Sequence, residues 1–371
     1  MFFMDSLYVV VPALALATGV VVAWLAVHSV VAHANMARRI ILTLVALPVT
    51  ALAAICTYNA VAVRLFLAAN PPSGKMYQVG GHRMHLYCIG SGQPTIVLEP
   101  GLGPATDVLS WSSLQAKLAT IARVCSYDRA GLGWSEPKEG RRDADQVAAD
   151  LHALLDQGGV VSRPLLLVGA SYGGIYIRDY TAHFPEEVTG LVFLDSSTPW
   201  QEERFRALAR DAGESHEARR MALLHALYLL GIARWRGWCG RPVPGLDARA
   251  GKALGEDACI AHYEGVREFL SMTESSAEVG RTGSFDALPV LIFSHDPGPQ
   301  PWADRETLWN TMQEELKKLS TRSRRIIARR SGHAVHVDRE DLVVREVGVF
   351  VEQVRRRTTA EPANCGLTTV E

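Results

Sequence analysis

The sequence has almost no net charge, because 38 basic and 39 acidic residues nearly cancel. Bulk electrostatics therefore give no reason to expect a nucleic-acid partner. No phosphate-binding loop, dinucleotide fingerprint or metal-ligand spacing appears along the chain, so neither a cofactor nor a metal is implied. Internal repeats and low-complexity tracts are also missing, and six cysteines in 371 residues exclude a disulfide-dense small protein.

Acidic residues are nearly missing from the first 75 positions, which hold Asp5 alone. Two stretches there, 7–31 and 40–63, carry no charge of either sign. About 20 apolar residues suffice for a helix to cross the ~30 Å hydrocarbon core of a bilayer. The sequence therefore predicts an anchor over residues 1–75 with two transmembrane helices. A cleaved signal peptide is the alternative, but the chain lacks a basic start and has a second apolar run.

The orientation of this anchor follows from its few basic residues. Arg38 and Arg39 lie in the short connection between the two predicted spans. The positive-inside rule places that connection in the cytoplasm and the large C-terminal part on the outer or periplasmic side. Arg64 and Lys75 favour the opposite orientation. The segment 70–74, Asn-Pro-Pro-Ser-Gly, ends the anchor as a stiff, helix-breaking linker.

From Met76 onward, short apolar runs alternate with helix-length segments. Most of the runs are continuously apolar, as in strands covered on both faces of a sheet. This alternation predicts an α/β fold with a mainly parallel sheet. Strands are expected at 76–79, 82–88, 95–98, 123–127, 165–168, 191–194, 290–293 and 325–327, and helices at 110–120, 143–157, 174–183, 305–319 and 341–355.

One long segment, about 196–285, interrupts the alternation with helix-like, charged and tryptophan-containing stretches. We interpret it as a cap inserted into a domain that covers residues 76–357. The remaining residues, 358–371, lack periodicity and are expected to form a flexible tail.

The most specific motif is Gly169-Ala170-Ser171-Tyr172-Gly173, which directly follows the apolar run 165–168. A G-x-S-x-G sequence between a strand and a helix is typical of a nucleophile elbow, in which a sharp turn exposes the serine hydroxyl. The small neighbours are needed because the strained turn leaves no room for larger side chains. The sequence therefore predicts Ser171 as a nucleophile.

A serine nucleophile needs a base and an orienting acid, which this fold supplies in the chain order Ser, acid, His. His333 follows the last predicted strand, from which a loop can return it to Ser171. Two acids satisfy the order: Asp296, after the strand 290–293, and Asp195, after the strand 191–194. We favour Asp296, because its loop is expected to lie nearer to the loop of His333.

Acyl transfer also needs hydrogen-bond donors for the oxyanion. One is expected to be the backbone N–H of Tyr172, immediately after the nucleophile. The other is expected from the glycine-rich segment after the first parallel strand, where Leu102 is the candidate. A plain turn is the alternative explanation for that segment.

With these motifs in order, residues 76–355 resemble a serine hydrolase of the α/β-hydrolase fold superfamily, and within it bacterial membrane-associated hydrolases and esterases. Ala170 stands where many members have His, and Pro100-Gly101 replaces a common His-Gly pair. The residues that carry the resemblance are Leu98–Gly103, Tyr127–Ser135, the turn at Ser171, Leu194–Ser196 and Ser331–His333.

The resemblance implies an eight-stranded, mostly parallel sheet flanked by helices, with a helical cap, here preceded by the transmembrane hairpin. It implies a triad of Ser171, His333 and Asp296, with oxyanion donors at Leu102 and Tyr172 and no cofactor. The expected reaction is hydrolysis of a small carboxylic ester, which the apolar cap and the bilayer anchor suggest is lipophilic. The alternatives are an acyltransferase or thioesterase with the same triad, or a non-catalytic membrane-tethered binding protein.

Four cysteines offer two disulfides. In this fold the strands that contain Cys88 and Cys125 are neighbours, and Cys239 and Cys259 both lie in the predicted cap. Such bonds would agree with a domain outside the cytoplasm. Buried free thiols are the alternative.

Overall fold

The computed structural model is built around one sheet of nine strands, in the order β1-β2-β4-β3-β5-β6-β7-β8-β9. It describes residues 13, 17–25, 27–28, 36–103, 107–160, 164–209, 214–242, 246, 248–257, 259–260, 263–296, 303–357 and 368–370.

The strands are β1 (Lys75–Val79), β2 (His82–Ile89), β3 (Thr95–Glu99), β4 (Val124–Tyr127), β5 (Leu165–Ala170), β6 (Val188–Leu194), β7 (Val290–His295), β8 (Ser323–Ala328) and β9 (Thr368–Val370). The helices are α2 (Met36–Ala69), α3 (Ser112–Leu118), α4 (Ala144–Gln157), α5 (Gly173–His183), α6 (Gln201–Ala209), α7 (Glu214–Leu229), α8 (Ile232–Trp235), α9 (Ala248–Asp257), α10 (Tyr263–Leu270), α11 (Met272–Gly280), α12 (Ala303–Glu315), α13 (Val335–Asp338) and α14 (Glu340–Arg357). Short 3₁₀ helices cover Val108–Trp111, Pro185–Glu187 and Leu316–Leu319.

The sheet is mostly parallel, as the sequence predicts. Strands β1, β2 and β4 pair antiparallel in that order, and every other pairing is parallel. All eight expected strands form. A ninth, β9, adds to β8 within the segment 358–371 that was expected to be a flexible tail. The rest of that segment, 358–367 and 371, lies outside the described residues.

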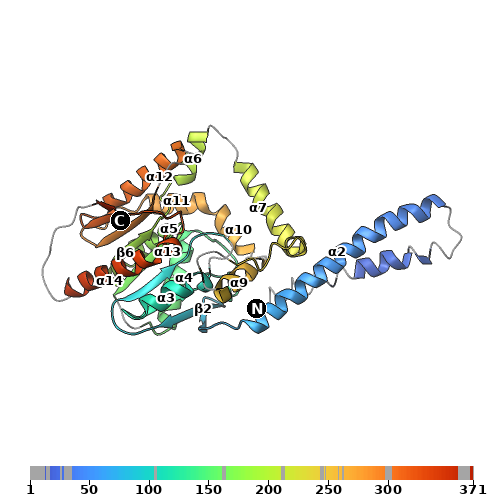
Figure 1. The fold of residues 1–371 in the computed structure, drawn as a ribbon, viewed down its shortest axis with the longest axis horizontal. Coiled ribbons are helices and arrows are strands. Elements are labelled where there is room, and N and C mark those ends of the chain that lie inside the picture. The colour runs from blue at the N-terminus through green and yellow to red at the C-terminus, as the bar shows by residue number, and fades with distance from the viewer. Residues whose placement is uncertain are drawn as a thin grey trace.

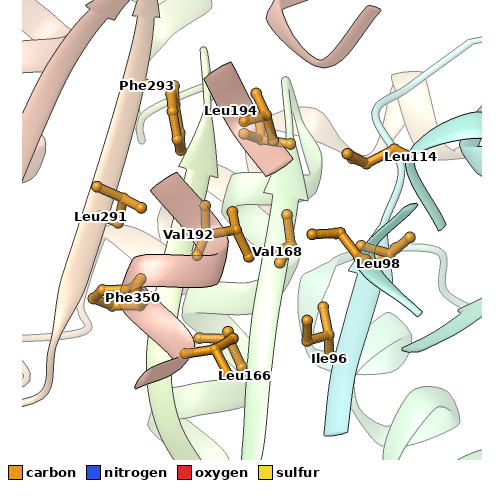
Figure 2. Close-up of a cluster of buried hydrophobic side chains, with 14 of the residues drawn as sticks. Ile96, Leu98, Leu114, Leu166, Val168, Val192, Leu194, Leu291, Phe293 and Phe350 are labelled. Atoms are coloured by element: carbon orange, nitrogen blue, oxygen red, sulfur yellow. The ribbon is translucent and has the colours of Figure 1, made fainter. Parts of the chain in front are cut away.

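Hydrophobic side chains fill both faces of the sheet, which explains why the central strands are continuously apolar. Ile96 and Leu98 of β3 point into one core, which α3 and α14 cover, as Figure 2 shows for part of this cluster. Val97, between them, points into the second core, to which α4 and α5 contribute. The carboxyl ends of the parallel strands therefore meet at one edge, with helices packed on both sides.

Along the chain, helices α6–α11 come after β6 and before β7, in the segment interpreted as a cap. The helix α2 projects away from the rest of the molecule (Figure 1) and contacts α8 of this segment near its own C-terminal end. There the buried Asn59 donates from Nδ2 to the carbonyl of Tyr228 (3.2 Å) and accepts at Oδ1 from Arg234 Nε (3.0 Å). A Cβ at Gly231 would lie 2.5 Å from the Cβ of Asn59, so only glycine fits at that position.

In the described residues, one stretch is long and apolar enough to cross a membrane: Thr43–Ala69, with a mean hydropathy of 1.8 over its most apolar window. It lies in α2, a 34-residue helix about 51 Å long, and overlaps the second predicted span. Most of the first predicted span, 7–31, falls outside the described residues. The pair of transmembrane helices therefore stays a prediction.

Both disulfides considered from the sequence form. Cys88 and Cys125 stand directly opposite each other in the antiparallel register of β2 and β4, with 4.0 Å between their Cα atoms. Cys239 and Cys259 join the loop after α8 to the residues that follow α9. The first bond ties together two sheet strands, and the second closes a loop of the cap.

Helix α14 should contribute strongly to stability through Phe350, which is 5% exposed and packs over Gly190 of β6. We expect Phe350→Ala to lower the free energy of unfolding by about 3–5 kcal/mol, because it leaves a cavity in the core. Val349→Ala is the control, since Val349 is 46% exposed and its loss should cost less than about 1 kcal/mol. Equal shifts of the two urea midpoints would contradict this assignment.

Candidate active site

Ser171 occupies the sharp turn between β5 and α5. Its φ of 51° lies in the left-handed region, which is strained for a residue with a side chain. Its backbone N–H donates to the carbonyl of Leu194 (3.1 Å), and its carbonyl accepts from Ser197 N–H (2.8 Å), so the neighbouring strand fixes the turn. A Cβ at position 173 would lie 2.4 Å from the carbonyl oxygen of Glu99, which explains the glycine there. This is the geometry predicted for a nucleophile elbow.

A continuous chain of hydrogen bonds runs from Ser171 through His333 to Asp195. Nε2 of His333 lies 2.9 Å from Oγ of Ser171, and its Nδ1 lies 2.6 Å from Oδ2 of Asp195. His333 sits in the loop between β8 and α13, and Asp195 follows β6. An imidazole that lies between a serine hydroxyl and a carboxylate can accept the proton of the hydroxyl. The carboxylate then stabilises the imidazolium that results.

Of the two candidate acids, the structure brings Asp195 to His333. Oδ2 of Asp195 lies 2.6 Å from Nδ1 of His333, the position at which Asp296 was expected. Asp296 instead accepts a hydrogen bond from the backbone N–H of Arg330 (3.4 Å). Because β6 and β7 are adjacent strands, both acids lie at neighbouring strand ends, and position alone favours neither. Asp195 also has a positive φ, of 46°, directly after β6.

The carboxylate of Asp195 is fully buried and accepts four hydrogen bonds. Its Oδ1 accepts from the backbone N–H of His295 (3.1 Å) and from Nε1 of Trp309 (3.0 Å). Its Oδ2 accepts from the rings of His295 (2.8 Å) and His333 (2.6 Å). Burial by itself would raise the pKa of Asp195, but the hydrogen bonds and charges of the two histidines lower it to about 2. The group is therefore ionised across the physiological range.

His295, Glu306 and Trp309 are members of this site that the sequence did not single out. Nε2 of His295 lies 2.8 Å from Oε2 of Glu306 on α12. Burial would lower the pKa of His295, but the hydrogen bonds and charges of Asp195 and Glu306 outweigh it and raise that pKa to about 9. The only sequence signal was the place of His295 at the end of a predicted strand.

The other nearby histidine, His336, lies outside this chain of hydrogen bonds. Its ring packs against Trp111 at a centroid distance of 4.9 Å. Burial, followed by the charge of His333, lowers the pKa of His336 to about 4, so the ring is neutral at physiological pH.

The two expected oxyanion donors lie in one region. A Cβ built on Gly101 would be 3.0 Å from the Cβ of Ser171, so the loop before Leu102 touches the elbow. Leu102 packs against a buried cluster that contains Tyr172. Tyr172 stands directly before α5, so its backbone N–H belongs to the unpaired amino end of that helix. These positions suit donors that face a reacting carbonyl oxygen.

A buried ion cluster holds the Gly101 loop in place. Arg129 donates to the carbonyls of Pro100 (2.9 Å) and Gly101 (2.7 Å), and it pairs with Glu99 (2.8 Å) and Glu268 (2.9 Å). All three charged side chains are at most 1% exposed. Burial raises the pKa of Glu99 to about 7, against the opposing charge of Arg129. Because Glu268 belongs to α10, the cluster joins the cap to the edge of the sheet.

An open cavity of about 360 Å³ lies beside the nucleophile, within the size range of small-molecule sites. The residues that line it include Ser171, Phe205, His295, Arg305, Trp309 and His333. Phe205 and Trp309 stack with 6.2 Å between ring centroids, and Arg305 lies over the Phe205 ring at 4.3 Å. The cavity therefore has an aromatic wall, formed by Phe205 and Trp309, and a positively charged lining residue, Arg305.

One group in the described part of the chain has the spacing that a metal ion requires. Ligand atoms of Asp145, Asp179 and His183 lie within 4.8 Å of one another. Asp179 and His183 already form an ion pair (3.3 Å), and the His183 side chain is 49% exposed. An ion pair between the half-exposed His183 and the buried Asp179 therefore accounts for this group.

The family model described as "Alpha/beta hydrolase family" matches residues 96–346, from β3 to α14. The chain belongs to this family. Membership supports a hydrolase with a small-molecule substrate, on the fold that the sequence predicts.

Individual relatives are distant. The "Uncharacterized protein YqjL" of Bacillus subtilis is 24% identical over 270 residues, 72% of this chain and 88% of that protein. The "Probable transporter efuK" of Hormonema carpetanum is 34% identical over 133 residues, 34% of this chain but 19% of that protein. Among solved structures, an esterase from Exiguobacterium antarcticum is similar to this alpha/beta hydrolase, with 16% identity and a TM-score of 0.56. The match covers 75% of this chain and 99% of the esterase chain.

The buried cluster around Arg129 should be essential to the fold. We expect Arg129→Met to lower the free energy of unfolding by about 3–5 kcal/mol, because it leaves the buried Glu99 without its cation and leaves Glu268 paired with Arg142 alone. Arg83→Met is the matched control, since the Arg83–Glu136 pair is half exposed and should contribute at most about 1 kcal/mol. Denaturant titration compares the stabilities of the two variants. Similar losses of unfolding free energy would show that the buried Arg129 contributes no more than an exposed ion pair.

Proposed function

We propose that this alpha/beta hydrolase cleaves a carboxylic ester with Ser171 as nucleophile, His333 as base and Asp195 as the acid, in place of Asp296. The observation that carries the proposal is the chain of hydrogen bonds from Ser171 through His333 to Asp195, at 2.9 and 2.6 Å. The strained turn that presents Ser171 supports it, because such turns occur where an exposed nucleophile is needed. The similar fold of the bacterial esterase agrees with this reaction.

In the proposed reaction, Oγ of Ser171 attacks the carbonyl carbon of the ester and its proton passes to Nε2 of His333. The buried carboxylate of Asp195 stabilises the imidazolium. The bond from the carbonyl carbon to the alcohol oxygen then breaks, and that oxygen takes the proton from His333. A water molecule attacks the acyl-enzyme by the same route, which releases the acid and restores Ser171.

The negative charge of the tetrahedral intermediate falls on the carbonyl oxygen. The backbone N–H groups of Leu102 and Tyr172 are the proposed donors to it, and Arg129 keeps the first of these loops in place through Pro100 and Gly101. Fixed donors of this kind need no rearrangement when the charge forms.

The aromatic side of the cavity favours a lipophilic group on the substrate. Phe205 and Trp309 are each less than 10% exposed and offer ring surface next to His333. The ring centroids of Trp309 and His333 are 5.4 Å apart. An apolar part of the substrate that packs against Trp309 therefore lies next to the reacting carbonyl group. An ester with an apolar acyl or alcohol part is therefore the proposed substrate class.

We also propose that α2 anchors the enzyme in a membrane and that the catalytic domain lies on its outer side. The apolar stretch Thr43–Ala69 supports the anchor. The Cys88–Cys125 and Cys239–Cys259 disulfides support the outer side, because such bonds persist in oxidising compartments. Arg38 and Arg39 precede this apolar stretch, where the positive-inside rule favours the cytoplasm.

The triad is tested with the full chain, a fluorophosphonate probe and p-nitrophenyl esters of increasing length. We expect Ser171→Ala to abolish labelling and Asp195→Asn to lower kcat/KM by about 1,000-fold or more, because the imidazole loses its orienting charge. The matched control is Asp296→Asn, which should stay within about threefold of the wild type. If Asp296→Asn is the inactive variant instead, the assignment of Asp195 as the acid is wrong. If the probe still labels Ser171→Ala, the assignment of Ser171 as the nucleophile is wrong.

The topology is tested by protease treatment of intact cells whose outer surface is accessible. We expect the enzyme to remain in the membrane after alkaline extraction, because an apolar helix holds it, and its catalytic domain to be digested from outside. Cells lysed before treatment provide the control for protease susceptibility. Full protection in intact cells, with digestion after lysis, would place the domain on the inner side.

A further inference from the structure

The acid of the proposed triad is shared by two histidines. Oδ2 of Asp195 accepts from Nδ1 of His333 at 2.6 Å and from Nδ1 of His295 at 2.8 Å. The proposed mechanism uses the first contact and leaves the second without a role. His295 is the last residue of β7, directly beside the end of β6, and its side chain is 12% exposed. The contact is therefore built into the sheet and shielded from solvent.

The second ring nitrogen of His295 also faces a carboxylate, Oε2 of Glu306, at 2.8 Å. An ionised carboxylate only accepts hydrogen bonds, so a histidine between two of them must donate from both nitrogens. A neutral imidazole has one N–H, whereas the imidazolium has two. The geometry therefore requires a protonated, positively charged His295. The rise of its pKa to about 9 agrees with this.

Within the described part of the chain, four charged or titratable groups face His295 or line the same cavity. They are Asp195 from the end of β6, Glu306 and Arg305 from α12, and His333 from the loop after β8. The two carboxylates hold the proton on His295, while Arg305 lines the same cavity and lies over the ring of Phe205. If His333 also took up a proton, it would be the second positively charged ring, after His295, on the carboxylate of Asp195.

We propose that His295 is a positioning residue that carries a permanent positive charge behind the triad acid, and that this charge extends the activity of the enzyme to lower pH. The inference rests on the proposed serine hydrolase mechanism. Hydrolysis needs His333 without a proton, because its ring must accept the proton of Ser171 when the serine attacks. The charge of His295 opposes a second positive charge on the same carboxylate, so the reactive form of the site persists at lower pH.

The experiment measures the rate of fluorophosphonate labelling of Ser171 against pH, with the full chain in detergent. Labelling needs no knowledge of the substrate. The informative variant is His295→Asn, whose amide nitrogen can take the place of Nδ1 and still donate to Asp195 without a charge. We expect its pH of half-maximal labelling to rise by about one unit, the size expected for the loss of one nearby charge in a partly buried site.

The matched control is Trp309→Phe. It removes another donor to Asp195, the Nε1–H at 3.0 Å, but no charge. If His295 only holds the carboxylate in place, the two variants should both lose rate and keep the wild-type midpoint. We expect Trp309→Phe to label more slowly with its midpoint unchanged within about 0.3 units.

A third variant, Glu306→Gln, keeps the residue's shape and removes the anion that holds the proton on His295. We expect its midpoint to rise by less than that of His295→Asn, and it provides the test if His295→Asn does not fold. An unchanged midpoint in both charge variants, or an equal shift in Trp309→Phe, overturns the role of His295. Failure of the wild type to label at any pH overturns the proposed function instead.

Discussion

The candidate site is organised by one buried negative charge, the carboxylate of Asp195. An ionised group without solvent contact is tolerated in a protein only when its oxygens are fully hydrogen-bonded. Here the donors come from three parts of the chain: β7 through His295, α12 through Trp309, and the loop after β8 through His333. The need to satisfy this charge therefore fixes how the last third of the domain lies against β6.

A second buried cluster does the same for the other side of the nucleophile. Arg129 satisfies Glu99 at the end of β3 and Glu268 in the cap, and it holds two carbonyls of the loop before Leu102. Ser171 thus lies between two charged clusters, one that orients the base and one that shapes the expected oxyanion loop. Each cluster spans segments far apart in sequence, so both form only when the sheet and cap are assembled.

Much of this could be predicted from the sequence because it depends on local pattern. Continuous apolar runs predicted the central strands, and the G-x-S-x-G turn predicted the strained Ser171. The carboxylate that contacts His333 could not be chosen in this way. Asp195 and Asp296 both follow strands, and those strands are neighbours, so the contact depends on where α12 and the loop after β8 pack. The Glu306–His295 contact likewise joins a strand end to a separate helix, which no local pattern reports.

The contact between α2 and the cap has a practical consequence for work on a soluble form. Asn59 satisfies the carbonyls of Tyr228 and Leu229 and the guanidinium of Arg234, and Ala60 and Val63 cover Ile260. A chain shortened to remove residues 1–75 would uncover this apolar surface and leave those polar groups to water. The part of α2 from Cys56 onward therefore packs against the cap, since Sγ of Cys56 already donates to the carbonyl of Leu230 (3.5 Å). A shortened chain that keeps the cap intact must begin before Cys56.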